Sequence, residues 1–166
     1  MEFPTVKNVS TEKYDLIKSL LAKDFSLTSG IIVLPENFET AVNEEDYRFS
    51  SSTETFVKLA KLNKLPIYVI ETQQEIHLIE NHSFEWVFPT LFISSLYLTQ
   101  NPLAISIAIN MISTYLLKLF HQDKTRKVKL NIFYEDNGAK ITKKIEYEGS
   151  IDGLGKVTEL CNNLSL

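Results

Sequence analysis

The residues best suited to chemistry are the acids that follow a short apolar run in the first quarter of the chain. Glu36 comes directly after the β-branched segment 31–34 and Pro35. Ligand sites in α/β proteins often form just beyond the end of a buried strand, where a carboxylate can serve in catalysis or binding. The sequence identifies no basic or histidine partner for Glu36. A small hydrolase or ligand-binding enzyme that uses the acidic loop 36–52 is therefore the alternative function and not the first.

Two histidines, His77 and His82, lie close in sequence to acidic residues. Imidazole and carboxylate groups together can hold a divalent metal. The neighbouring acids are Glu75, Glu80 and Glu85. However, His77 alternates with apolar residues as a strand residue does, and the spacing matches no familiar ligand set. We expect no metal and no other cofactor.

The glycine-containing stretch 149–156 is partly similar to a phosphate-binding loop. Five residues separate Gly149 from Gly155 where that loop has four, and a valine follows the lysine where Ser or Thr should bind magnesium. The pattern instead favours the exit of a strand and the start of a helix. Ser150 or Asp152 is then the residue that caps the helix.

The single cysteine, Cys161, excludes an internal disulfide and favours a reducing compartment. Its helical spacing from Val157 and Leu160 predicts a thiol in the core and not a nucleophile. The N-terminal residues 1–4 lack a basic region followed by an apolar stretch, so we expect no signal peptide. These features predict a cytoplasmic protein.

Length and charge limit the class of protein further. The chain has 166 residues, of which 44% are hydrophobic, and a net charge of −4. These values predict a single domain over 1–166, and the lack of a basic excess excludes generic phosphate binding, so we expect no nucleic-acid partner. Segment 35–55 carries a net charge of −5 and segment 118–144 one of +5. Either these are two solvated surfaces, or they are complementary patches that steer self-association or a charged partner.

Hydrophobic periodicity and turn residues predict the order of the elements. In the first half, the expected elements are a helix over 11–24, a strand over 31–34 that follows Gly30, and a loop over 36–52 with one helical turn. A helix capped by Thr53 with a stop at Asn63 follows, and then strands over 66–70 and 76–79. In the second half, alternation of apolar and polar residues predicts a β-hairpin, with strands over 128–132 and 140–147 around a turn at 136–138. A final helix over 152–164 closes the chain.

The 32 residues from Trp86 to Leu117 contain no Asp, Glu, Lys, Arg or His. A run of this length must be covered by a core, a partner or a membrane. Because Pro102 cannot sit comfortably inside one helix, we expect two helices, over 83–100 and 102–122. A membrane span needs about 20 predominantly apolar residues. The second helix offers only 15 before Lys118, so we expect no membrane insertion.

The apolar residues of this second helix exceed one face. One face carries Leu103, Ile107, Met111, Ile112 and Leu116, and another carries Ile105, Ile109 and Tyr115. One face can cover the sheet, and the other needs a different cover. We expect Ile105, Ile109 and Tyr115 to form an interface in a homo-oligomer or with a protein partner. Full burial within one chain is the alternative.

The order of several short motifs resembles that of small uncharacterised bacterial proteins encoded beside conflict or anti-phage genes. The motifs are LPENF over 34–38, FSSSTETF over 49–56, FPTLF over 88–92, IEYEG over 145–149 and GL at 153–154. They span most of the chain but carry no catalytic residue. The resemblance extends to effector-associated adaptor components, and it implies a scaffold or regulator that acts beside a separate effector.

The sequence therefore predicts a cytoplasmic α/β protein, with α+β as a variant. A small sheet and a C-terminal β-hairpin are expected to pack around a central apolar helix pair. The expected function is a non-enzymatic interaction or assembly module, such as an adaptor or regulator in a bacterial defence or stress operon.

Overall fold

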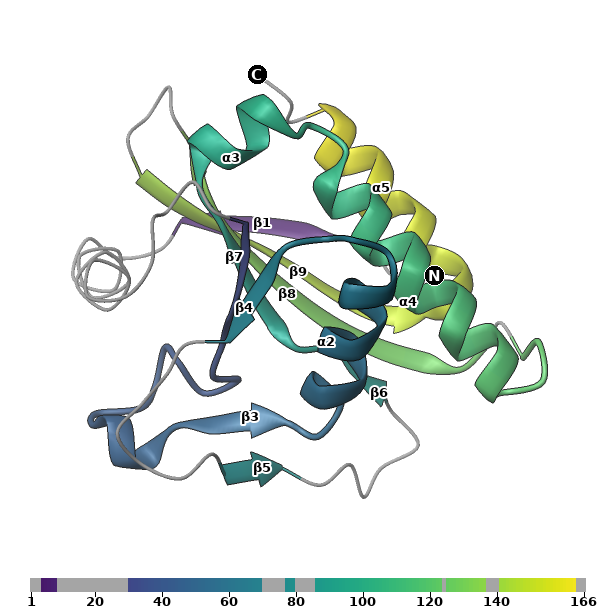
Figure 1. The fold of residues 1–166 in the computed structure, drawn as a ribbon, viewed down its shortest axis with the longest axis horizontal. Helices are drawn as coiled ribbons and strands as arrows, with labels where there is room; N and C mark the ends of the chain where they lie inside the picture. Colours follow the sequence, from purple (N-terminus) through teal and green to yellow (C-terminus); the bar gives the residue numbers. More distant parts are fainter. Residues whose placement is uncertain are drawn as a thin grey trace.

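A mixed β-sheet of seven strands forms the centre of the described part of the protein (Figure 1). This computed structural model describes residues 4–8, 30–69, 77–79, 86–123, 125–136 and 141–163. The helix expected over 11–24 and most of the hairpin turn lie outside these residues. The strands of the sheet, in spatial order, are β1 (Thr5–Asn8), β9 (Ile141–Ser150), β8 (Lys127–Asp136), β7 (Thr90–Ile93), β2 (Ile31–Leu34) and β4 (Ile67–Val69), with β6 (Trp86–Val87) also paired to β8.

The directions of these strands make the sheet mixed. β4 runs parallel to β2, and both β6 and β7 run parallel to β8. The other pairs are antiparallel, including the long β8–β9 hairpin that the alternating pattern predicts. A separate parallel pair joins β3 (Arg48–Ser50) to β5 (His77–Ile79). The expected α/β class is confirmed.

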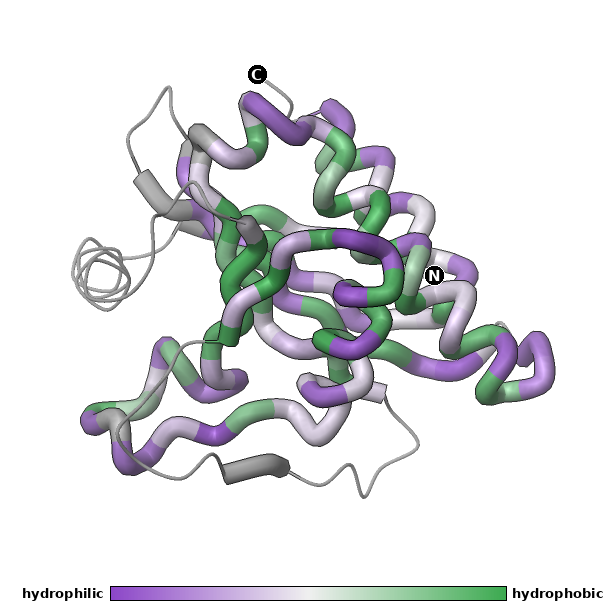
Figure 2. The backbone as a smooth tube through the Cα atoms, viewed as in Figure 1, coloured by the Kyte–Doolittle hydropathy of each residue, from purple (hydrophilic) through white to green (hydrophobic). Residues whose placement is uncertain are grey.

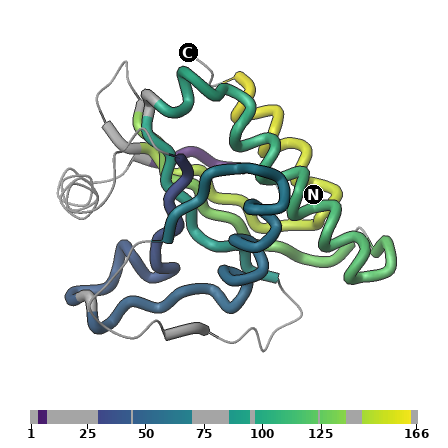
Figure 3. The backbone as a smooth tube through the Cα atoms, in the orientation of Figure 1, coloured from purple at the N-terminus to yellow at the C-terminus, as the bar shows by residue number. Residues whose placement is uncertain are grey.

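Three helices pack together beside the sheet: α2 (Thr53–Leu62), α4 (Ala104–Leu119) and α5 (Leu154–Asn163). α4 and α5 lie side by side, and α2 contacts α4 on another side (Figures 1 and 3). A short helix, α3 (Ser95–Gln100), precedes α4. Two single helical turns, η1 (Glu44–Asp46) and η2 (Ile151–Gly153), complete the helical elements of the described residues.

The core lies between the helices and one face of the sheet. Alternation along β8 and β9 turns one set of side chains inward, and all of these are buried: Val128, Leu130, Ile132, Ile145 and Tyr147. Figure 2 shows that the central strands are hydrophobic. The other face of the same two strands is polar, which leaves it available for a site. None of the helices in the described ranges is both long and apolar enough to cross a membrane.

The prediction of a helix over 83–100 is wrong for residues 86–93 and is confirmed only for its last part, residues 95–100. Residues 86–87 and 90–93 form β6 and β7, and the helix begins only at Ser95, where the Ser94 hydroxyl accepts a hydrogen bond from the N–H of Tyr97 at 3.1 Å. β7 lies between β2 and β8 and is buried on both faces. A strand buried on both faces is a continuous apolar run, which periodicity alone cannot distinguish from a buried helix. The central helix pair therefore consists of a short α3 and a long α4.

The break at Pro102 is confirmed, because Asn101 caps the end of α3 and α4 begins at Ala104. α4 ends at Leu119 and not at residue 122, and the two residues after Phe120 have positive φ angles. The helix expected from Thr53 is confirmed, as is its stop at Asn63. Its N-cap is Ser52 and not Thr53.

The loop expected over 36–52 holds the expected helical turn, η1, but its last part is the strand β3. The expected strand over 66–70 appears as β4, and the one over 76–79 as β5, within the described residues. The final helix begins at Leu154 after the turn η2, two residues later than expected.

Candidate functional site

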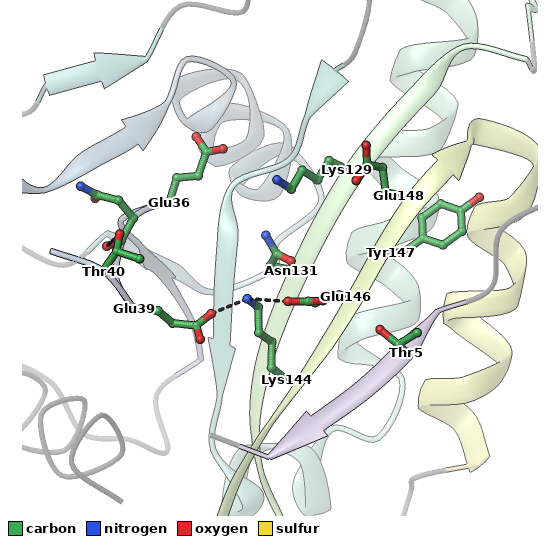
Figure 4. A pocket seen from close by; sticks show the side chains of 11 residues that line it. Thr5, Glu36, Glu39, Thr40, Lys129, Asn131, Lys144, Glu146, Tyr147 and Glu148 are labelled. Carbon is green, nitrogen blue, oxygen red and sulfur yellow. Dashed lines mark hydrogen bonds and ion pairs between the residues drawn. The ribbon is translucent and has the colours of Figure 1, made fainter. Parts of the chain in front are cut away.

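An open hollow of about 740 Å³ lies where the polar face of the sheet meets the segment after β2 (Figure 4). Its lining is strongly charged. The lining residues are Thr5, Glu36, Asn37, Glu39, Thr40, Lys129, Asn131, Lys144, Glu146, Tyr147 and Glu148. The hollow thus brings the sequence-predicted Glu36 together with residues of three strands far from it in the chain.

The floor of the hollow is the polar face of β8 and β9. Lys129 is paired with Glu148 and Asn131 with Glu146 in the register of the two strands. Because side chains alternate along a strand, these residues point away from the buried face. The alternation of side chains along the hairpin therefore explains why these polar residues form the floor of the hollow.

The wall of the hollow is the segment 36–40, and Asn37 holds it in place. The side-chain oxygen of Asn37 accepts a hydrogen bond from the N–H of Arg48 at 2.8 Å, and its amide nitrogen donates to the carbonyl of Asp46 at 2.7 Å. The N–H of Glu36 donates to the carbonyl of Arg48 at 2.7 Å. These bonds fix the backbone on both sides of Glu36 and therefore fix the origin of its side chain.

Phe38 anchors the same segment to the sheet. Its ring is buried and meets the ring of Phe133 edge-on, with 6.2 Å between the ring centroids. The ammonium group of Lys144 lies 5.5 Å from the centre of the Phe133 ring. Phe133 is an apolar residue on this otherwise polar face of β8 and β9, and Phe38 covers it. The charged residues of the same face remain uncovered and line the hollow.

One half of the hollow is neutralised within the protein. Lys144, whose side chain is only 14% exposed, forms ion pairs with Glu39 and with Glu146, the latter at 2.8 Å (Figure 4). Lys7 forms a further ion pair with Glu146 at 2.8 Å. Hydrogen bonds from Lys144 and Lys7 lower the pKa of Glu146 from 4.5 to about 2. Burial tends to lower the pKa of Lys144, but its bonds to Glu146 and Glu39 outweigh this and raise that pKa. This cluster ties β1, β9 and the wall together.

The other half of the hollow holds groups without such bonds. The side chains of Glu36, Lys129 and Asn131 form no hydrogen bond or ion pair with another residue in the described ranges. Burial raises the pKa of Glu36 above 4.5, and the charge of Lys129 partly offsets this. A partly desolvated carboxyl group can bind a cation or exchange a proton.

Sequence reasoning singled out Glu36 but missed Lys129, the base whose charge acts on it. Alternation in the hairpin does place Lys129 on the polar face. The sequence does not show, however, that β8 lies next to β7 and β7 next to β2, and only this strand order brings the two residues together.

The remaining candidates for chemistry have structural roles or lie outside the described residues. Cys161 is buried, and burial raises its thiol pKa to about 12, which confirms the expected core thiol. Among the described residues no group of three His, Cys, Asp or Glu could hold a metal. His77 lies in β5 as expected, whereas His82, Glu75, Glu80 and Glu85 lie outside the described residues.

Two glycines of the stretch 149–156, Gly149 and Gly153, make room for Tyr147, whereas Gly155 has open space around it. A Cβ atom at Gly153 would lie 1.9 Å from the hydroxyl oxygen of Tyr147, which itself donates to the carbonyl of Ser150 at 2.7 Å. The hydroxyl of Ser150 accepts a hydrogen bond from the N–H of Gly153 at 3.2 Å, so the expected cap is confirmed. Close packing thus accounts for these residues.

The expected interface residues on α4 are mostly in the core. Ile105 is 5% exposed and Ile109 is 2% exposed, and Tyr115 is half-buried. Ile105 and Ile109 therefore offer no surface on a single chain, because α2, α5 and the sheet surround α4 on several sides. Helical periodicity separates the faces of a helix but does not show which of them remains uncovered.

A different part of α4 is apolar and exposed. Leu103 is 60% and Ile107 is 47% exposed, and Leu62 on α2 is 79% exposed. A groove of about 470 Å³ runs between α2 and α4, and its lining residues are Leu59, Asn63, Ile107, Asn110, Met111, Thr114, Tyr115 and Lys118. An adjoining hollow of about 310 Å³ shares Asn63 and Ile107 and includes Lys64 and Leu103. We call these two hollows and their lining residues the α2–α4 face.

Comparisons of the chain with models of protein families, with curated proteins and with solved structures find no match. The resemblance of the sequence motifs to defence-associated bacterial proteins stays a prediction. The two candidate surfaces, the charged hollow and the α2–α4 face, are therefore compared by their own chemistry.

Proposed function

We propose that this protein is a non-enzymatic interaction module of the cytoplasm that binds an acidic, amphipathic segment of a partner protein on its α2–α4 face. The observation that carries the proposal is the exposure of Leu103 and Ile107 next to a groove between two helices. Contiguous exposed apolar surface on a monomer marks an interaction site more often than isolated apolar residues do. A groove between helices is also a common seat for the apolar face of a partner helix.

Charge specifies the chemistry of the partner. The lining of the α2–α4 face contains Lys64 and Lys118 and no acidic residue among those described. α4 itself carries Lys118 as its one charged residue. A partner that covers the apolar groove and presents carboxylates to these two lysines gains both burial and electrostatic complementarity.

The same charges disfavour a symmetric dimer through this face. In a two-fold interface each patch meets its own copy, so Lys64 and Lys118 would add like charges on both sides. A separate partner is therefore the preferred occupant, and a homo-oligomer is an outcome that the test distinguishes. The resemblance to adaptor components favours an effector protein as this partner, encoded in a bacterial defence or stress operon.

Two synthetic amphipathic peptides test this proposal. Both carry leucine on one helical face, and the other face carries glutamate in one peptide and lysine in the other. We expect the Leu/Glu peptide to bind by fluorescence anisotropy at least about tenfold more tightly than the Leu/Lys peptide, since charge complementarity sets the preference. Ile107→Asp should abolish this binding, and Val42→Asp should not.

Val42 is a matched control because it is apolar and 87% exposed but lies outside the α2–α4 face. Equal binding of both peptides, or binding that survives Ile107→Asp, would contradict the proposal. Light scattering on the wild-type chain distinguishes the homo-oligomer. A mass that is a stable multiple of 19.0 kDa and that falls to the monomer in Ile107→Asp would replace the separate partner by a second copy.

A second candidate function is ligand binding in the charged hollow. It is favoured by the partly desolvated carboxyl of Glu36, which faces Lys129 in an open cavity. This corresponds to the acidic-loop alternative of the sequence analysis. Loss of ligand binding in Glu36→Gln, without loss of the folded state, is the result that this candidate predicts.

A further inference from the structure

We infer that the charged hollow binds a small zwitterion, with the ligand's ammonium group at Glu36 and its carboxylate at Lys129. The inference rests on the second candidate function and is independent of the α2–α4 face. It names the class of ligand: an amino acid or another short molecule that carries one primary ammonium and one carboxylate.

The first argument is that the charges of the hollow divide into a satisfied and an unsatisfied set. Lys144 has ion pairs to Glu39 and Glu146, and Glu146 has a further one to Lys7. That set needs no ligand. Glu36, Lys129 and Glu148 line the same hollow, and none of the three forms an ion pair within the described residues. Glu148 is exposed and lies opposite Lys129 in the register of β8 and β9, whereas Glu36 lies on the wall across from that floor. A zwitterion between Glu36 and Lys129 would pair both of these charges at once.

The second argument is that both groups originate from fixed backbone. Glu36 lies between Pro35 and Asn37, and the side chain of Asn37 is bonded to Arg48 and to Asp46. Lys129 lies on β8, which is hydrogen-bonded to strands on both sides. The backbone positions from which the acid and the base extend are therefore set by the fold, so a ligand orders only their side chains when it binds.

The third argument concerns the polarity and sign of the lining. The amide of Asn131 lies between Lys129 and Lys144 (Figure 4) and adds a donor and an acceptor without a partner among the described residues. The lining holds four glutamates and two lysines, a net charge of −2. This excess of acid favours a ligand that presents an ammonium group. The raised pKa of Glu36 agrees, because a cation beside it would replace the water that the carboxyl has lost.

Three amino acids whose ammonium and carboxylate groups are separated by one, two or three carbon atoms test the spacing between Glu36 and Lys129. Glycine, β-alanine and γ-aminobutyrate are titrated into the isotope-labelled protein, with butylamine and butyrate as the two halves, and amide NMR shifts are followed. We expect one of the three zwitterions to bind at least about tenfold more tightly than either half, since each charged hydrogen bond contributes a similar factor. The shifting signals should belong to residues 36–40 and to β8.

Variants show whether the named residues are responsible. Glu36→Gln and Lys129→Gln should each weaken the preferred zwitterion by about tenfold or more, and Glu159→Gln, an exposed change on α5, should leave its affinity unchanged. Binding of none of the probes, binding of butylamine as tight as that of every zwitterion, or unchanged affinity in both hollow variants would each overturn the inference. Peptide binding at the α2–α4 face reports on the first proposal separately.

Discussion

The side-chain oxygen of Asn37 accepts a hydrogen bond of 2.8 Å from the N–H of Arg48, in the place of a backbone carbonyl. The same side chain donates to the carbonyl of Asp46. Residues 36–40 form no regular element, so this amide supplies the hydrogen bonds that a strand or helix would otherwise give. The wall of the charged hollow is therefore held by the Asn37 side chain together with the backbone bond from Glu36 to Arg48 and the buried ring of Phe38.

Replacing this side chain should destabilise the fold. Asn37→Ala leaves the N–H of Arg48 and the carbonyl of Asp46 without their partner, and we expect a loss of about 1 to 3 kcal/mol in the free energy of unfolding. Urea unfolding measures this loss. Asn43→Ala is the control, because Asn43 is exposed in the same loop and its side chain has no such bonds. Equal midpoints for the two variants would mean that the wall is held by Phe38 alone.

Glu36 should reduce stability at neutral pH. Burial raises its pKa in the folded state, so folding favours the protonated carboxyl, and the ionised form costs stability above that pKa. Glu36→Gln should therefore unfold at a higher urea concentration than the wild type at neutral pH. The difference should shrink as the pH falls towards 4.5, the ordinary value. A variant less stable than the wild type at neutral pH would show that the carboxylate holds the wall together.

The ion-pair cluster around Lys144 should make stability depend on pH in the opposite direction. The pKa of Glu146 is lowered to about 2, so its carboxylate stabilises the fold above its ordinary value of 4.5, and this contribution is lost as the pH falls from there through 2. Glu146→Gln should be less stable than the wild type above pH 4.5 and equal to it near pH 2. Circular dichroism during acid titration measures this. Added salt should reduce the difference, since the pairs are partly exposed. A constant difference at all pH values would point to packing as the cause.

Two isoleucines two residues apart on α4, Ile107 and Ile109, should respond in opposite ways to the same change. Ile109→Asp places an unpaired charge in the core and should cost more than about 3 kcal/mol of stability. Ile107→Asp changes an exposed residue and should keep the thermal midpoint within a few degrees of the wild type, since surface changes alter stability by about 0.5 kcal/mol. Thermal unfolding compares the two. A folded, stable Ile109→Asp protein would restore the expected interface at Ile105, Ile109 and Tyr115.

The elements that local sequence determines could be predicted. The helix α2 and the hairpin β8–β9 each have a clear period of apolar residues with turn or capping residues at their ends. β2 has no such period, but it is a short β-branched run between Gly30 and Pro35. β7 was not recognised because a strand buried on both faces lacks the alternation that distinguishes a strand from a helix. Pro89 and Ser94 flank β7, but they can be recognised as its ends only once the place of this strand in the sheet is known.

The sites depended on information that one sequence does not contain. Glu36 could be singled out because it follows a buried strand, but its neighbour Lys129 lies on a strand that only the sheet order brings close. Similarly, periodicity gave α4 more than one apolar face. The packing of α2 and α5 against α4 decides which of these faces is covered. It covers Ile105 and Ile109 and leaves Leu103 and Ile107 exposed.

The most direct test of the proposed α2–α4 face is an NMR titration of the Leu/Glu peptide into protein with isotope-labelled isoleucine methyl groups. Ile107 is exposed in the groove and Ile132 is a fully buried residue of β8, so both signals are followed in one experiment. We expect the Ile107 methyl signal to shift with the peptide concentration and the Ile132 signal to stay in place. A peptide that binds without moving the Ile107 signal, or that does not bind at all, would contradict the proposed function.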